Sequence, residues 1–305
     1  MIVGIDIGGT KTHVVIEDDG VTVLDRSVLS SDWQRGGLLD DEGNVGRLLA
    51  LLEPIVGAAS APLVIGAHGL DSDWQTLEFN ARVAAQHGGP ARAVNDVELL
   101  GPAAGYDDAI AVIVGTGSKV VAHTADGEPL SAGGYGFLLS DPGSAPALAR
   151  DAVRAILDAH DEGDEVDALG RALMDHFAVD DVIALSYAFT NHPKLTVWGA
   201  LAPLVFAAAD AGSALAASVI DDAAKELADG VGLVHARGAV GTDVVCAGGV
   251  ITNQPRLYRA LTRHIDDLGL GLTVHLLQVA PVVGAVALAS KLHTHAPSTE
   301  SWRNS

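Results

Sequence analysis

The sequence feature that most constrains the fold is a strand–turn–strand pattern that occurs twice. The segments IGGTKTHVVIEDDG, from Ile7, and VGTGSKVVAHTADG, from Val114, have equal length. In each segment an apolar strand end enters a turn of Gly and Thr, a Lys follows, and a β-branched strand leads to Asp-Gly. We interpret this match as an internal duplication, because repetition of one pattern indicates repeated structural units.

The rest of the chain alternates between strand-like and helix-like segments. Continuous apolar or β-branched runs predict strands, and apolar residues at helical spacing predict helices. We expect strands at 2–7, 12–16, 63–67, 91–94, 109–114, 119–123, 243–247 and 272–277, with a strand pair at 21–24 and 26–29. We expect helices at 43–59, 71–87, 145–160, 165–177, 182–188, 198–209, 213–236, 254–268 and 282–293.

This order of elements predicts an α/β protein with two related domains that face each other over a central cleft. No Pro- or Ser-rich linker interrupts the chain, so we place the domain boundary between the two repeats. The expected domains are 1–106 and 107–305, with the closing helix 282–293 able to pack back on the first domain. Ligands of such folds bind at the carboxyl ends of the strands, where both Gly/Thr turns are expected.

The composition excludes several classes of protein. Among 305 residues, 39 are acidic and 18 are basic, and the basic residues form no run, which excludes a nucleic-acid partner. Cys246 is the single cysteine, so the chain holds no internal disulfide and no cysteine zinc site. The N-terminus does not read as a signal peptide, and the apolar stretch 197–220 contains Asp210. We therefore expect a cytoplasmic protein without a membrane partner, and a homodimer is compatible with the sequence.

The two Gly/Thr turns are candidate phosphate-binding sites. Glycine allows backbone amides to approach an anion closely, and successive amides in a turn form a concave cradle. The first turn offers Gly8, Gly9, Thr10 and Lys11, and the second offers Gly115, Thr116, Gly117 and Ser118. The alternative is that both are ordinary tight hairpins. A Walker loop is excluded because these glycines lead into a strand and not into a helix.

Two aspartates are expected beside the first turn. Asp6 lies within a buried strand, where a Mg²⁺ bound to nucleotide phosphates, directly or through water, would compensate its charge. The alternative for Asp6 is a structural hydrogen bond. Asp96 follows a strand at the expected cleft, where a carboxylate can accept a proton from an attacking hydroxyl. The alternative for Asp96 is an N-cap of the next helix.

Two further glycine pairs favour ligand contacts in the second half of the chain. Gly133 and Gly134 offer amides to a polyol, and Asp141 can accept hydrogen bonds from hydroxyl groups. The alternative there is a loop in which Ser144 caps a helix. Gly248 and Gly249 follow a strand, and their flat backbone lets a planar base lie against them, whereas Cys246 is expected in the core.

Taken in order, these motifs resemble the N-acetylglucosamine kinase group of the BadF/BadG/BcrA/BcrD ATPase family, within the actin-like sugar kinase superfamily. They are Asp-x-Gly-Gly-Thr-Lys at 6–11, Asn95-Asp96, Gly-Thr-Gly-Ser at 115–118, Gly-Gly-Tyr-Gly at 133–136 with Asp141-x-Gly-Ser, and Ala-Gly-Gly at 247–249. The resemblance spans about residues 2–290. It implies two ribonuclease-H-like domains that close over ATP and a sugar.

The resemblance also implies a role for each matching residue. Asp6 would organise Mg²⁺, both Gly/Thr turns would hold the phosphates, and Asp96 would act as the general base on the sugar 6-hydroxyl. Gly248 and Gly249 would line the adenosine. The sugar would contact Trp33, His68, Asn95, Asp96, Thr116, Gly133, Gly134 and Asp141.

We therefore expect an ATP-dependent carbohydrate kinase that acts on an amino sugar, N-acetylglucosamine or glucosamine. Tyr135 and Pro142 depart from the family pattern, in which a Trp and an acidic residue stand at these positions. The sequence leaves open the choice of sugar, the effect of Pro142 on it, the oligomeric state and any regulator. The alternative is a non-catalytic or regulatory protein that binds sugar and ATP on a kinase fold.

Overall fold

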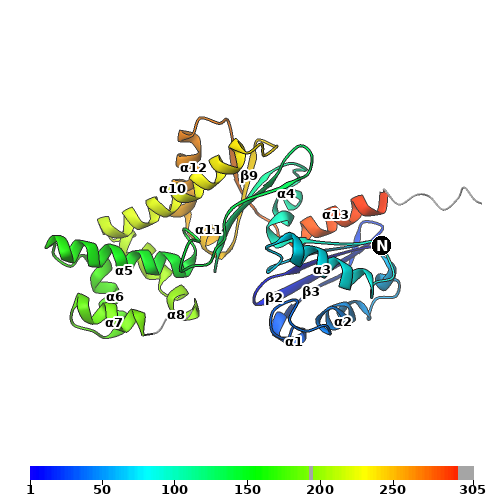
Figure 1. Cartoon of the computed structure of the whole chain (residues 1–305), viewed down its shortest axis with the longest axis horizontal. Helices are drawn as coiled ribbons and strands as arrows, with labels where there is room; N and C mark the ends of the chain where they lie inside the picture. Colours follow the sequence, from blue (N-terminus) through cyan, green and yellow to red (C-terminus); the bar gives the residue numbers. More distant parts are fainter. Residues whose placement is uncertain (192–194, 295–305) are drawn as a thin grey trace, which may run out of the picture. The chain divides into compact units, whose positions relative to one another are not determined.

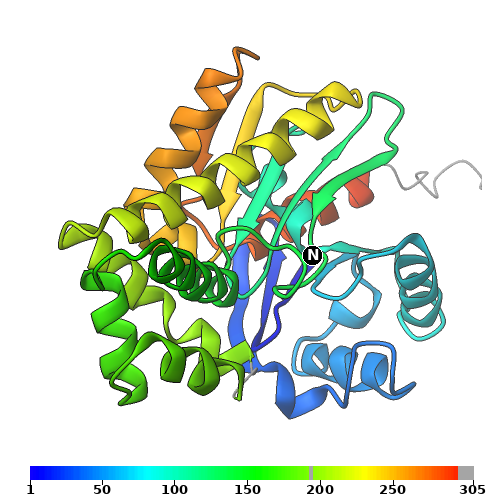
Figure 2. The same cartoon turned by 60° about the vertical axis from the view of Figure 1, so that its left-hand side comes forward.

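A computed structural model describes residues 1–191 and 195–294. Contacts along the chain divide it into two compact units. Unit 1 comprises 1–107 together with the segment that starts at Gln278, and unit 2 comprises 108–277. Figure 1 and Figure 2 show both units as mixtures of helices and strands, which confirms the predicted α/β class.

The sheet of unit 1 has the strand order β3-β2-β1-β4-β5. The first three strands form an antiparallel meander, and β4 and β5 continue in parallel with β1. This order brings the end of β1, which carries Asp6, next to the end of β4. The strands are β1 (Ile2–Ile7), β2 (Lys11–Asp18), β3 (Val21–Leu29), β4 (Leu63–Ala67) and β5 (Ala91–Asn95).

Helix α13 (Val282–Thr294) completes unit 1 although it comes last in the chain. It packs on β1 and on α4 (Leu100–Ala103), and Figure 1 shows it in red beside the blue strands. Two glycines allow this close approach. A Cβ added at Gly4 would lie 2.7 Å from Val286 Cγ2, and one added at Gly284 would lie 2.0 Å from the Leu99 carbonyl oxygen. The remaining helices of unit 1 are α1 (Ser30–Trp33), α2 (Asn44–Leu49), α3 (Asp73–Ala84) and the 3-10 helices 50–52, 58–60 and 96–99.

The sheet of unit 2 repeats the topology of unit 1 with the order β10-β9-β6-β7-β8. Again three strands form an antiparallel meander and two continue in parallel. The repeated strand–turn–strand units therefore occupy equivalent places in two sheets, as the sequence match predicts. The strands are β6 (Ile110–Val114), β7 (Ser118–His123), β8 (Pro129–Gly133), β9 (Asp243–Ala247) and β10 (Thr273–Leu276).

Helices cover the sheet of unit 2 and bury its core. Helix α10 (Ala214–Ala236) contacts β7 and β8, and in Figure 2 it crosses the strands as a long yellow-green helix. Within the described ranges no single helix is long and apolar enough to cross a membrane. The segments Leu195–Asp210 and Ala214–Ala236 pass that test of length and composition only together, as a pair bent by 117°. The other helices are α5 (Ala145–Glu162), α6 (Ala168–Phe177), α7 (Val182–Thr190), α8 (Leu195–Gly199), α9 (Ala202–Asp210), α11 (Gly249–Asn253) and α12 (Pro255–Asp267).

Two predicted elements differ clearly from the structure, and one strand was not predicted. In place of the helix expected at 43–59, the structure has the shorter helix α2, which ends at Leu49, and a 3-10 turn that ends at Leu52. The helix stops there because Pro54 cannot continue it and restricts the conformation of the residue before it. The strand pair expected at 21–24 and 26–29 is one strand, β3. The edge strand β8 was not expected, since it begins at Pro129, a residue that sheets tolerate only at such edges.

Candidate functional site

The first Gly/Thr turn joins β1 to β2 and is held from behind by Ser30. The Gly8 amide donates to the Lys11 carbonyl at 2.9 Å, which closes the turn. The Ser30 amide donates to the Thr10 carbonyl at 2.9 Å, and the Ser30 hydroxyl donates to the Gly8 carbonyl at 2.9 Å. Gly9, Thr10 and Lys11 are exposed. The turn is therefore fixed by hydrogen bonds on one side and exposed on the other, as a turn that binds an anion through its amides must be. Phosphate binding there stays a prediction.

Trp33 lies behind this turn and not on its open side. The side chain is 3% exposed, and its indole Nε1 donates to Thr12 Oγ1 at 2.9 Å. Thr12 Oγ1 in turn lies 3.1 Å from Ser30 Oγ, so the chain of hydrogen bonds ends on the Gly8 carbonyl. This burial corrects the expected sugar contact of Trp33, because almost no indole surface is available to a ligand. Trp33 instead positions the turn.

Asp6 and Asp96 are close enough to interact at the carboxyl end of the unit 1 sheet. Burial raises the pKa of Asp6 from 3.8 to about 7, and the negative charge of Asp96 contributes to that rise. His13 opposes the rise from its place opposite Asp6 in the β1–β2 ladder, and His13 Nε2 lies 2.7 Å from Asp25 Oδ1. Desolvation and a nearby like charge both disfavour the ionised form of a carboxyl group, and a bound cation would stabilise that form. This fits the predicted role of Asp6 toward Mg²⁺.

Asn95, and not Asp96, caps the short helix after β5. The Asn95 side-chain oxygen accepts the Val97 amide at 3.1 Å, and the Glu98 carboxylate accepts the Asn95 amide at 3.0 Å. The alternative reading of Asp96 as the N-cap is therefore wrong. The Asn95 side-chain nitrogen donates to Leu70 O at 3.0 Å and to an Asp71 carboxylate oxygen at 3.2 Å, so both of its hydrogens are used inside unit 1.

His68 completes the group of candidate residues in unit 1. Its amide donates to the Ile7 carbonyl at 2.8 Å, and its exposed ring lies 3.9 Å from where a Cβ on Gly9 would be. The part of the chain that the structure describes has no group of three or more His, Cys, Asp or Glu side chains that could hold a metal ion.

In unit 2 the second Gly/Thr turn lies beside the glycine pair that follows β9. A Cβ added at Gly115 would lie 3.5 Å from the Gly249 amide nitrogen. Gly248 has φ 109°, and a Cβ there would lie 2.5 Å from the Val114 carbonyl oxygen, so only glycine fits this position. Two of the predicted ligand-binding segments of unit 2, the second Gly/Thr turn and the Gly248–Gly249 pair, therefore meet at the ends of β6 and β9. The Cys246 thiol is fully buried, as expected for a core residue, and burial raises its pKa to about 12.

Asp141 lies against the same turn. It has φ 58°, its Oδ1 accepts the Gly136 amide at 3.1 Å, and its Oδ2 would lie 3.1 Å from a Cβ on Gly117. Gly133 and Gly134 also have positive φ values, 74° and 79°, which shape the loop after β8. Thus the structure brings the candidate residues of unit 2 together, as it does those of unit 1.

The sequence reading missed two supporting residues, Ser30 and Arg150. Arg150 donates from Nη1 to the carbonyl oxygens of Phe137 and Ser140, the latter at 3.1 Å, and so holds the loop that carries Asp141. No motif marks Arg150, because it acts through backbone groups that only the fold brings near. Ser30 directly follows β3, and a Ser at a strand end was the one available signal.

Known proteins resemble this chain over most of its length. It is 27% identical to an N-acetylmuramic acid/N-acetylglucosamine kinase of Clostridium acetobutylicum over 284 residues, which cover 87% of this chain and 90% of that protein. It is 24% identical to an N-acetyl-D-glucosamine kinase of Dictyostelium discoideum, over 75% of this chain and 77% of that protein.

A solved structure shows the same fold. A candidate N-acetylglucosamine kinase from Chromobacterium violaceum superposes with a TM-score of 0.69 at 23% identity, covering 94% of this chain and 98% of that one. The sequence profile of the BadF/BadG/BcrA/BcrD ATPase family matches residues 3–289. The two repeated sheets, the turns at their edges and this match lead to one conclusion: the chain belongs to the BadF/BadG/BcrA/BcrD ATPase family.

Proposed function

We propose that this protein transfers the terminal phosphoryl group of ATP to the 6-hydroxyl of an amino sugar, N-acetylglucosamine or glucosamine. The family and the kinase names of the similar proteins support the reaction class. One observation carries the proposal: β1, β4 and β5 are parallel, so Asp6, the Gly8–Lys11 turn after β1 and Asp96 after β5 lie at the same end of the unit 1 sheet. A candidate proton acceptor, a candidate cation ligand and a candidate anion cradle thus share one end of a sheet.

In the proposed reaction the sugar hydroxyl oxygen attacks the γ-phosphorus of ATP, and the bond from that phosphorus to the bridging oxygen breaks to give ADP. Asp96 accepts the proton of the hydroxyl as the new bond forms. Asp6 would hold Mg²⁺ through water, and the cation would neutralise phosphate charge. The Gly8–Lys11 and Gly115–Ser118 turns would donate amide hydrogens to the phosphate oxygens.

The other candidate residues would hold the two substrates. Gly248 and Gly249 would lie against adenosine, as their open backbone allows. The sugar would contact His68, Thr116 and Asp141 through side chains and Gly133 and Gly134 through amides. Asn95 would contribute through its position before Asp96, because its side-chain hydrogens are used elsewhere. With ATP as donor, the proposal also implies a cytoplasmic location.

The test is an ADP-release assay with glucosamine, N-acetylglucosamine, N-acetylmannosamine, glucose and mannose. We expect turnover with at least one of the first two sugars. Asp96→Asn should lower kcat by about 10²- to 10⁴-fold with little change in ATP affinity, since it removes the proton acceptor and keeps the shape. Unchanged kcat in this variant would contradict the assigned role. Binding of sugar and ATP without ADP release would instead identify the non-catalytic or regulatory protein.

A further inference from the structure

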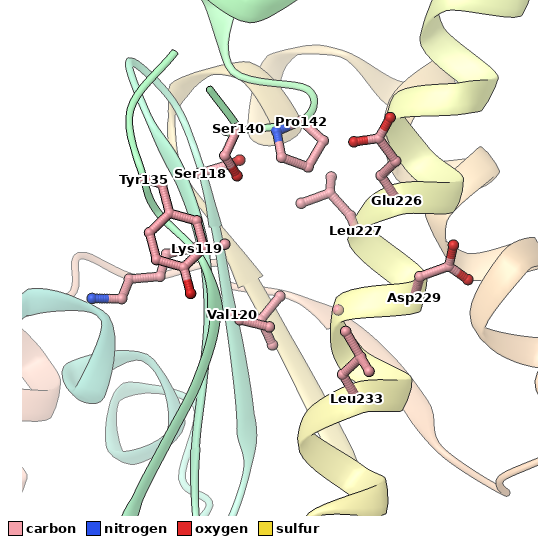
Figure 3. Close-up of a pocket in the computed structure, with 13 residues that line it drawn as sticks. Ser118, Lys119, Val120, Tyr135, Ser140, Pro142, Glu226, Leu227, Asp229 and Leu233 are labelled. Atoms are coloured by element: carbon pink, nitrogen blue, oxygen red, sulfur yellow. The ribbon is translucent and has the colours of Figure 1, made fainter. Parts of the chain in front are cut away.

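A pocket of about 240 Å³ lies in unit 2 between α10 and the strands β7 and β8. Helix and sheet touch at Gly230, where an added Cβ would lie 3.2 Å from Val120 Cγ2. Figure 3 shows the pocket lining with Ser118, Val120 and Tyr135 on the sheet side and Leu227 on α10. Ser118 and Gly133, which the proposed function assigns to phosphate and sugar contacts, also line this pocket.

The pocket lining is mainly apolar, and it also carries the hydroxyl groups of Ser118, Tyr135 and Ser140 and the charged groups of Lys119, Glu226 and Asp229. Its lining includes Val120, Pro142, Leu227 and Leu233. Ser118 is 3% exposed, and its Oγ has no hydrogen-bond partner among the described residues. A buried hydroxyl without a partner destabilises the fold, so a ligand atom that hydrogen-bonds to it would be favoured. The pocket therefore suits a mainly apolar molecule with a polar group.

The pocket lining holds the carboxylates of Glu226 and Asp229 and the ammonium group of Lys119, and Asp229 pairs with Lys225 at 2.7 Å. Glu226 lines the pocket from α10, and in Figure 3 its carboxylate extends toward Pro142. Burial and the nearby charge of Asp151 raise the pKa of Glu226, and Arg150 acts against them. The Arg150 guanidinium is however bonded to both carboxylate oxygens of Asp151, at 2.8 and 2.9 Å. The Arg150 guanidinium is thus engaged with Asp151, and in Figure 3 the ammonium group of Lys119 lies away from Glu226, so a positively charged ligand would add a partner for this carboxylate.

We propose that this pocket binds a small organic amine, an apolar body that carries one protonated amino group. The apolar body fills the space between α10 and the sheet, and the ammonium group pairs with Glu226. Ser118 ends the second Gly/Thr turn, and Pro142 directly follows Asp141, so a bound amine contacts both segments beside the candidate site. Occupancy should therefore change the KM for ATP. This last consequence rests on the proposed kinase function, whereas binding of the amine does not.

The experiment compares benzylamine with its neutral and anionic analogues, benzyl alcohol and benzoate, by saturation-transfer NMR and calorimetry on the full chain. We expect benzylamine to bind most tightly and benzoate not to bind. Glu226→Gln should raise the Kd for benzylamine about twofold to fivefold, the range of one partly exposed charge pair. The matched control is Asp222→Asn, which removes the same charge from α10 outside the pocket lining and should change the Kd less than Glu226→Gln does.

A second variant tests the location. Ala132→Leu adds volume to the lining, and a folded variant, checked by circular dichroism, should lose benzylamine binding. Equal affinities for benzylamine and benzyl alcohol, an unchanged Kd in Glu226→Gln, or full binding by folded Ala132→Leu would each overturn the proposal. If benzylamine binds as expected while no sugar is phosphorylated, only the proposed kinase function and the predicted change in KM fail.

Discussion

Replacing Asp6 by Asn should stabilise the protein above neutral pH. The pKa of Asp6 rises from 3.8 to about 7 in the folded chain, chiefly by burial and then by the charge of Asp96, while His13 opposes the rise. Below about pH 4 the carboxyl group is protonated in both the folded and the unfolded chain. As pH rises further, the unfolded chain releases this proton first, so the free energy of unfolding falls until pH passes the folded pKa.

The size of the effect follows from the shift. At 1.36 kcal/mol per pKa unit, a rise from 3.8 to about 7 amounts to about 4 kcal/mol of lost stability above pH 7. Asn keeps the size of the side chain and has no charge to desolvate, so Asp6→Asn should recover most of this free energy at pH 8. At pH 4 the variant and the wild type should differ little.

The measurement is urea unfolding at pH 4, 6 and 8 in the presence of EDTA, so that no divalent cation offsets the charge. Trp33 is a suitable fluorescence reporter because it is buried in the core of unit 1. The control is Asp25→Asn, which removes a carboxylate that is 64% exposed and should gain no such stability. The reasoning is refuted if Asp6→Asn is no more stable than the wild type at pH 8, or if its gain is the same at all three pH values.

Two further substitutions test how the fold supports the candidate site. Trp33→Phe removes the hydrogen bond to Thr12 and should lower the free energy of unfolding by about 1–3 kcal/mol. If the Gly8–Lys11 turn shifts as a result, the KM for ATP should rise more than the KM for the sugar. An unchanged melting temperature would contradict the positioning role. Gly284→Ala would place a methyl group 2.0 Å from the Leu99 carbonyl oxygen, so we expect at least about 1–3 kcal/mol of destabilisation, measured by thermal unfolding; a neutral result would show that α13 can move away from this contact.

The sequence determined the repeated architecture and the location of the candidate residues along the chain. Both Gly/Thr turns sit between strands, and Asp6 and Asp96 sit within and after strands, as the local patterns predict. Such features depend on neighbours in sequence: apolar runs specify strands, and glycines specify tight turns. Where a local signal was overlooked, as at Pro54 and Pro129, the predicted element was wrong or missing.

Only the tertiary structure decided what each side chain contacts. The sequence did not reveal that Trp33 points into the core, that Asn95 and not Asp96 caps a helix, or that Arg150 holds a loop 10 residues away. The pocket under α10 likewise joins Ser118 to Glu226, which are far apart in the chain. Burial, hydrogen-bond partners and pKa shifts arise from segments that meet only after folding, so a reading of local pattern has no access to them.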